Sequence, residues 1–134
     1  MSWYVLAWQR ATDFSGRSRR KEYWYFNLFN GIIFVFLFLF AVPFDKHEKP
    51  AMFPLGLMFV YSLIVLVPSL SVIIRRLHDI GKSGWWYFIS FIPLIGGVVL
   101  FVFTLLDSEP SPNQWGLDPK ASERVMVPPY AMPR

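Results

Sequence analysis

The sequence predicts an all-α, polytopic membrane protein with three transmembrane helices, an amphipathic interfacial helix at the N-terminus and an extended C-terminal tail. Hydrophobic residues make up 54% of the 134 residues, and they stand in long blocks rather than at alternating positions. Charged residues make up only 16%, whereas soluble domains contain about 25%. Each block is long enough to cross a hydrocarbon core of about 30 Å, so a bilayer accounts for the composition better than a soluble core does.

The composition also excludes several chemistries. The sequence contains no cysteine, which rules out disulfides, thiolate nucleophiles and cysteine-based metal or iron–sulfur sites. The net charge is +4, but the basic residues are grouped beside the apolar blocks, where they set the orientation of a membrane protein. We therefore expect no nucleic-acid partner, no metal site and no cofactor.

The N-terminal segment favours a short helix that lies on the membrane surface. Tyr4, Ala7, Trp8 and Ala11 follow i, i+3, i+4, i+7 spacing, which gives one apolar face over residues 3–14. Tryptophan and tyrosine favour the headgroup level of a bilayer because each has an apolar body and a polar tip. The alternative is a frayed terminus.

The first apolar block predicts a transmembrane helix over residues 24–44. It spans about 31 Å at about 1.5 Å per residue, which matches the hydrocarbon core. It is longer than the apolar part of a signal peptide and ends without a small-x-small cleavage pattern, so we expect a retained anchor. The preceding basic residues mark a cytoplasmic flank; they are Arg17, Arg19, Arg20 and Lys21.

Two further apolar blocks predict the second and third transmembrane helices. A short polar connection, residues 45–50, leads into a span over residues 53–74, in which Pro68 should introduce a kink. The third span covers residues 85–106 and contains Pro93 near its middle.

The sequence changes character from Asp107 onwards. Six of the eleven prolines occur here, among polar residues and without hydrophobic periodicity, so we expect a mostly extended or mobile segment. We assign residues 1–120 to a single membrane domain and residues 121–134 to a flexible, Pro-rich tail.

The distribution of basic residues predicts the topology. Five stand before the first helix, and three more lie between the second and third helices, in or beside the polar hinge of residues 75–84 (RRLHDIGKSG). Because cytoplasmic flanks are enriched in lysine and arginine, we place the N-terminus and the hinge in the cytoplasm. Three spans then put the C-terminus on the periplasmic or extracellular side.

Two polar segments should meet at the cytoplasmic surface, since the first two helices are antiparallel. Unpaired charge is costly near the hydrocarbon boundary, so we expect Glu22 or Asp79 to pair with an arginine, leaving four or five cations in excess. These would attract anionic lipid headgroups, phosphate or an acidic partner segment. The candidate lipid- or partner-binding cluster is Arg17, Arg19, Arg20, Glu22, Arg75, Arg76, His78, Asp79 and Lys82. The alternative is that the basic flanks serve only to orient the protein.

His78 has two further interpretations, a general base oriented by Asp79 or Glu22, or a metal ligand. A metal would have only one imidazole at this surface, because His47 is predicted on the opposite side. The sequence Gly81-Lys82-Ser83 is not a phosphate-binding loop, since the motif requires a glycine where Arg76 stands and a preceding strand. We assign no catalytic residue.

Three segments together resemble the DUF805 family of small bacterial inner-membrane proteins, the YhaH-like group. They are GRSRRKEYW at residues 16–24, RRLHDIGKSGWW at residues 75–86 and NQWGLDP at residues 113–119. The resemblance implies a bacterial plasma-membrane protein with a few helices and implies no activity. The last segment supplies a second family motif, Asn113, Gly116, Asp118 and Pro119. A third spanning helix would separate this motif from the hinge.

The sequence thus predicts an integral inner-membrane protein that is not an enzyme. We expect a non-catalytic accessory or scaffold protein that docks a partner protein or anionic lipid through its basic cytoplasmic face. A small oligomeric transporter or channel is the alternative, although the spans contain almost no ionisable residue to line a pathway. A membrane enzyme using His78, Asp79 and Glu22 on a lipid headgroup is the third possibility. The expected partners are membrane lipids, a membrane protein or further copies of the chain.

Overall fold

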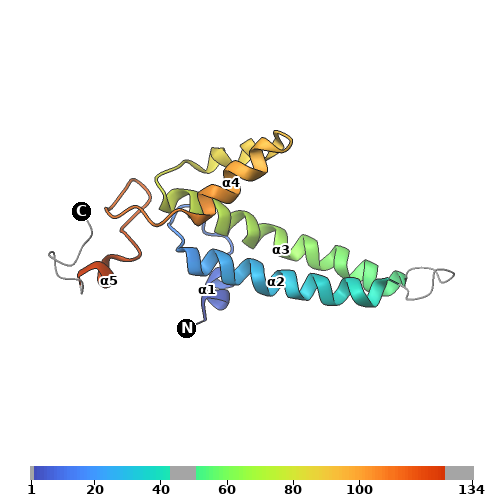
Figure 1. The fold of residues 1–134 in the computed structure, drawn as a ribbon. Coiled ribbons are helices and arrows are strands. Elements are labelled where there is room, and N and C mark those ends of the chain that lie inside the picture. Colours follow the sequence, from blue (N-terminus) through green and yellow to red (C-terminus); the bar gives the residue numbers. More distant parts are fainter. Residues whose placement is uncertain (1, 43–50, 126–134) are drawn as a thin grey trace.

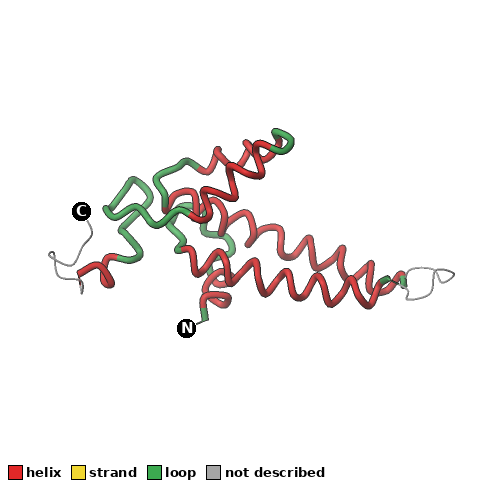
Figure 2. The backbone as a smooth tube through the Cα atoms, viewed as in Figure 1, coloured by secondary structure: helices red, strands yellow, loops and turns green. Residues whose placement is uncertain are grey.

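The computed structural model describes residues 2–42 and 51–125, and within these residues the protein is helical and contains no strand (Figures 1 and 2). The elements in order are α1 (Trp3–Gln9), α2 (Arg20–Ala41), α3 (Met52–Asp79), the 3-10 helix η1 (Gly84–Phe91), α4 (Ile95–Leu105) and α5 (Ala121–Val125). The predicted all-α class is therefore confirmed. The predicted polar connection at residues 45–50 lies outside the described residues.

The long helices α2 and α3 form an antiparallel pair that gives the molecule its length (Figure 1). Both are long and apolar enough to cross a membrane, and their outer faces leave residues such as Phe36, Phe40 and Leu63 exposed. A hydrogen bond joins the two helices, in which the Tyr61 hydroxyl donates to Asn30 Oδ1 at 2.5 Å. Exposed apolar surface of this extent indicates contact with lipid.

Helix α1 is shorter than predicted and packs against α2. Tyr4 and Trp8 lie against Phe26 with ring centroids 6.0 Å away in each case, and Ala7 is fully buried in the same cluster. The predicted apolar face is confirmed, whereas the predicted helix over residues 10–14 is wrong. The Asp13 carboxylate there accepts hydrogen bonds from its neighbours, and such local side-chain bonds stabilise a turn in place of a helix.

The predicted third transmembrane helix over residues 85–106 is wrong. This segment forms a hairpin of η1 and α4 that is linked by a sharp turn in which Leu94 has φ 66°. Helix α4 has 11 residues, about 16 Å, which is about half of a hydrocarbon core. The two arms approach closely at Gly96, where an added Cβ would lie 1.7 Å from the Ile89 carbonyl oxygen.

Because the hairpin reverses, the chain after α4 returns to the end of the α2–α3 pair where α3 finishes (Figure 1). The Glu109 amide donates to the Asp79 carbonyl oxygen at 2.8 Å. The prediction that the C-terminal motif lies across the membrane from the hinge is therefore wrong. Residues 107–118 are fixed against the hinge, and residues 121–125 form α5; the rest of the predicted Pro-rich tail lies outside the described residues.

Helix α3 also continues beyond its predicted end at Ile74, through the first five residues of the hinge, to Asp79. The charged residues that marked the end of the apolar block are accommodated inside the protein instead. This extension brings their side chains into the site described next.

Candidate functional site: a polar network at one end of the helix pair

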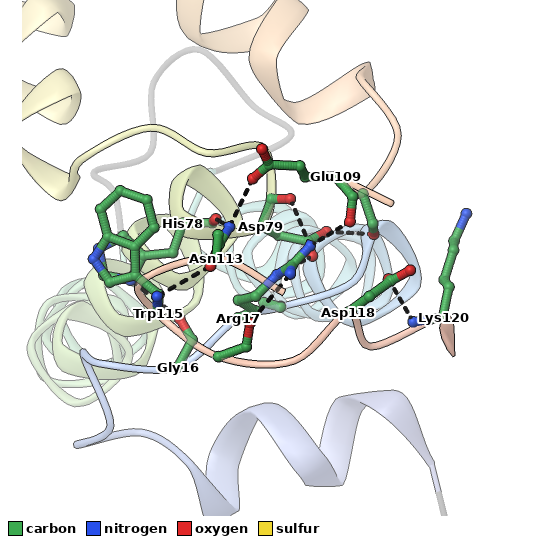
Figure 3. A network of polar contacts seen from close by, with 12 residues as sticks. Gly16, Arg17, His78, Asp79, Glu109, Asn113, Trp115, Asp118 and Lys120 are labelled. Carbon is green, nitrogen blue, oxygen red and sulfur yellow. Dashed lines mark hydrogen bonds and ion pairs between the residues drawn. The ribbon is translucent and has the colours of Figure 1, made fainter. Parts of the chain in front are cut away.

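Asp79 lies at the centre of a buried polar network (Figure 3). Its Oδ1 accepts a hydrogen bond from Arg17 Nε at 3.1 Å, and its Oδ2 accepts from Arg76 Nη1 at 2.5 Å and from Ser108 Oγ at 2.5 Å. The Asp79 side chain is 0% exposed. One carboxylate therefore connects the segment before α2, the end of α3 and the segment after α4.

Arg17 extends this connection to the C-terminal segment. Its Nη1 donates to the Ser111 carbonyl oxygen at 2.9 Å, and its Nη2 donates to the carbonyl oxygens of Glu109 at 2.7 Å and Asp79 at 3.1 Å. The five N–H donors of a guanidinium lie in a rigid fork, and here the fork fixes the path of residues 107–111.

A second buried ion pair joins α2 to α3. Arg75 Nη1 and Glu22 Oε1 are 2.5 Å apart, and the two side chains are 0% and 2% exposed. Arg75 Nε also donates to Ser71 Oγ at 3.3 Å, and the Ser71 hydroxyl donates to the Asp13 carbonyl oxygen at 2.6 Å. The prediction that Glu22 or Asp79 pairs with an arginine is confirmed, and both carboxylates do so. We call Arg17, Glu22, Arg75, Arg76, Asp79 and Ser108 the polar network.

His78 is oriented by the backbone and by an indole, and not by Asp79 or Glu22 as the general-base interpretation requires. Its Nδ1 lies 3.1 Å from the Gly16 carbonyl oxygen. Its ring stacks on Trp115 with centroids 4.5 Å apart and planes 5° from parallel. The carboxylates that the general-base hypothesis required are instead bound to arginines.

The second motif lies at the same end of the molecule as the hinge. Asn113 Nδ2 donates to the His78 carbonyl oxygen at 2.9 Å and to Glu109 Oε2 at 2.8 Å. The backbones of Asn113 and Gly116 exchange hydrogen bonds of 3.0 and 3.1 Å, and Gly116 has φ 138°, which favours glycine. Gly116 also accepts a long, 3.4 Å bond from Arg17.

The end of the second motif orders the start of α5. Asp118 is buried, and its carboxylate accepts from the Lys120 amide at 2.9 Å and from Arg124 Nε at 2.7 Å. Pro119 lies between Asp118 and Lys120 in the sequence, and it has no backbone N–H that needs a hydrogen-bond acceptor. Asp118 and Pro119 are therefore near the polar network but support the segment that follows it.

Three further cations form a partly exposed group. Arg19 pairs with Glu123 at 2.7 Å, Arg20 lies 3.6 Å from Asp107, and Lys120 also pairs with Asp107. These cations lie around a recess of about 110 Å³, which we call the basic recess. It is lined by Arg19, Arg20, Lys21, Lys120 and Glu123. Lys82 lies elsewhere, over the rings of Trp86 and Phe103.

The expected excess of four or five free cations at the surface is therefore too large. Arg17, Arg75 and Arg76 are buried and bind carboxylates or backbone carbonyls. They hold the protein together and are not available to a lipid or a partner.

The two carboxylates beside the basic recess are held in their ionised forms. Partial burial would raise the pKa of Asp107, but hydrogen bonds from Lys120 and Ser108 outweigh burial and lower it. The hydrogen bond from Arg19 likewise lowers the pKa of Glu123. These anions offset only part of the positive charge around the recess.

Sequence reasoning missed several members of the site: Gly16, Ser71, Ser108, Glu109 and Trp115. Trp115 lies within the segment of the second motif, residues 113–119, and this position could have identified it as a site residue. Gly16 begins the first family segment but contributes only its backbone carbonyl. Ser71, Ser108 and Glu109 contribute single polar side chains or backbone groups, for which the sequence has no distinctive pattern. Among the described residues, no group of three or more His, Asp or Glu side chains is placed to hold a metal ion.

The fold and the site define a small helical membrane protein whose polar segments meet at one end of two long apolar helices. The chain belongs to the family described as "Protein of unknown function (DUF805)", which matches residues 11–117 and so includes the hinge and, of the second motif, Asn113 and Gly116. It is 38% identical to the inner membrane protein YhaI of Escherichia coli strain K12 over 120 residues, 90% of this chain and 97% of that protein. It is 37% identical to the inner membrane protein YhaH of the same strain over 120 residues, 90% of this chain and 98% of that protein. No solved structure matches the chain.

Proposed function

We propose that the protein is a non-catalytic accessory protein of the bacterial inner membrane that binds anionic lipid headgroups in the basic recess. The observation that carries the proposal is the convergence of Arg19, Arg20, Lys21 and Lys120 on one exposed recess. Two acidic side chains, Asp107 and Glu123, offset these four cations, which leaves two positive charges uncompensated. Lys21 has no ion-pair partner among the described residues.

The position of the recess suits a lipid phosphate. It lies at the start of α2, where the apolar surface of the helix begins. Trp24 and Tyr25 are exposed one turn further along the helix. Aromatic side chains of this kind favour the headgroup level. The excess of basic residues at this end supports a cytoplasmic location, where the membrane surface is anionic.

The polar network has a defined part in this proposal. Lys120 and Glu123 follow residues 107–118, which Arg17 and Asp79 hold against the start of α2. The network therefore assembles the recess from segments about a hundred residues apart in the sequence. The buried charges therefore position the residues that line the recess, and no catalytic step is involved.

The test is the affinity for phosphatidylglycerol of the purified protein in phosphatidylcholine nanodiscs, measured by native mass spectrometry. The variant K21Q/K120Q should bind phosphatidylglycerol roughly 30-fold more weakly, because each basic residue near an anionic headgroup contributes about 1 kcal/mol. Binding by the native chain should also weaken as salt concentration rises.

The matched control is K46Q/K49Q, which removes the same charge in the segment predicted to face the opposite side. It should leave the affinity within about twofold. Equal losses in the two variants, or unchanged binding in K21Q/K120Q, would contradict a lipid site in the recess. Unchanged lipid binding together with loss of a co-purifying acidic protein would assign the recess to a protein partner instead.

A further inference from the structure

A second pocket lies at the same end of the molecule, between α3 and η1. It has a volume of about 340 Å³ and is lined by Phe14, Ile74, His78, Ser83, Gly84, Trp85 and Phe88. This volume is at the lower end of the range for small-molecule sites, about 300–1,000 Å³. Most of the lining is apolar, and among the described residues no lysine, arginine, aspartate or glutamate lines it. We call it the His78 pocket.

The contacts of His78 fix what its ring offers to this pocket. Nδ1 lies 3.1 Å from the Gly16 carbonyl oxygen, and a carbonyl only accepts, so Nδ1 carries a proton. In the neutral ring Nε2 is then an acceptor. A charged ring would be a cation in a side chain that is only 6% exposed and without an ion-pair partner among the described residues, which is costly.

The acceptor nitrogen faces the pocket. A Cβ built on Gly84, which lines the pocket, would lie 3.7 Å from His78 Nε2. Nε2 has no hydrogen-bond partner among residues 2–42 and 51–125, whereas the opposite edge of the ring is bound to Gly16 and one face is covered by Trp115. The pocket thus contains an oriented acceptor that has no hydrogen-bond partner among the described residues.

Ser83 supplies the complementary polar group. The Ser83 hydroxyl oxygen accepts a bond of 3.4 Å from the Trp85 amide, which leaves the hydroxyl hydrogen to donate. A ligand in the pocket therefore meets one acceptor and one donor. A hydroxyl matches both, since it donates and accepts. An ammonium group cannot accept, and a phosphate would meet no cation among the described residues that line the pocket.

We infer that the His78 pocket binds a membrane lipid through a free hydroxyl group, which donates to His78 Nε2 while the acyl part lies against Ile74, Trp85 and Phe88. The lipid enters sideways from the bilayer, because Trp85 and Phe88 also belong to the exposed apolar face of the hairpin. This site shares no residue with the basic recess and requires no anionic group. It therefore stands or fails independently of the proposed function.

The probe is 1,2-dioctanoylglycerol, and its 3-O-methyl ether is the control because it lacks only the hydroxyl donor. The protein, labelled with ¹⁵N-histidine, is placed in phosphatidylcholine nanodiscs, and the ring nitrogens are observed by NMR. His47→Asn leaves His78 as the single histidine. We expect a protonated Nδ1, an unprotonated Nε2, and an Nε2 resonance that shifts on addition of dioctanoylglycerol and not of the ether.

His78→Asn separates the pocket role from a structural one. The Asn amide can replace Nδ1 as the donor to Gly16, but it has no group at the position of Nε2. This variant should keep the helical circular dichroism spectrum and bind dioctanoylglycerol about tenfold more weakly, while His47→Asn should bind normally. K21Q/K120Q should also bind it normally.

Two results would overturn the inference, and both come from the chain with His78 intact, so they do not depend on the folding of His78→Asn. One is an Nε2 that carries the proton. The other is an Nε2 shift that is absent with dioctanoylglycerol or equal for dioctanoylglycerol and its ether.

Discussion

Asp79→Asn is expected to lower the free energy of unfolding by about 3–5 kcal/mol, because it leaves two buried guanidiniums without their carboxylate. Arg17 and Arg76 both bind Asp79, and the Asp79 side chain is 0% exposed. Asparagine keeps the size of the side chain, so the loss reports on charge rather than on packing. The measurement is unfolding by SDS in mixed micelles, followed by circular dichroism.

Asp107→Asn is the matched control for Asp79→Asn. The Asp107 side chain is 52% exposed while it pairs with Arg20 and Lys120, and exposed pairs contribute about 0–1 kcal/mol. Similar losses for the two variants would contradict a structural role for the buried network. The Asp79 variant should also free residues 107–118, which would be seen as faster amide hydrogen exchange at Glu109.

The second large effect concerns the Glu22–Arg75 pair. Glu22→Leu alone and Arg75→Met alone should each cost about 3–5 kcal/mol, because each leaves one buried charge unpaired. The double variant removes both charges and should unfold within about 1–2 kcal/mol of the native protein, since apolar residues of similar size can replace a buried ion pair. A double-mutant cycle in the same SDS assay measures the coupling.

The exposed Arg20–Asp107 pair provides the comparison for this cycle. Its side chains are 44% and 52% exposed at a separation of 3.6 Å, so its coupling should be below about 1 kcal/mol. Additive losses at Glu22 and Arg75 would show that the two side chains act separately and would contradict the geometry described above.

The two long helices were predictable because length and apolar composition are sufficient to recognise a membrane span. Their ends were less predictable. Helix α3 continues to Asp79 because Arg75, Arg76 and Asp79 are paired inside the protein. Helix α2 begins at Arg20, four residues before the predicted start. Hydropathy treats every charge as a boundary, and it carries no information on whether a partner lies nearby.

The η1–α4 hairpin shows the limit of an argument from length. Residues 85–106 have the length of one span, and the segment before Pro93 is too short to cross a bilayer. Both statements about length are correct, but the prediction of a single span also assumes that every apolar segment crosses the membrane. The signals of reversal were Pro93 and Gly96, and only the structure shows that Gly96 permits contact with the Ile89 backbone.

Only part of the membership of the candidate site was predictable from the sequence, and its arrangement was not. The sequence indicated that Glu22 or Asp79 would bind an arginine, and both do. It gave no indication that Arg17 reaches residues 109–111, because that contact depends on the hairpin. A single span over the hairpin residues would put the two motifs on opposite sides of the membrane, and it therefore cannot predict the network that they share.

The most direct test of this account uses the absence of cysteine from the chain. Single cysteines at Ser83, Ser122 and Lys46 are introduced separately, and intact spheroplasts and inverted vesicles are treated with a non-permeant thiol reagent. We predict that Ser83 and Ser122 are labelled only in inverted vesicles and that Lys46 is labelled only in spheroplasts. Labelling of Ser83 and Ser122 from opposite sides would contradict the central claim, that the hinge and the second motif form one site at the same end of the helix pair.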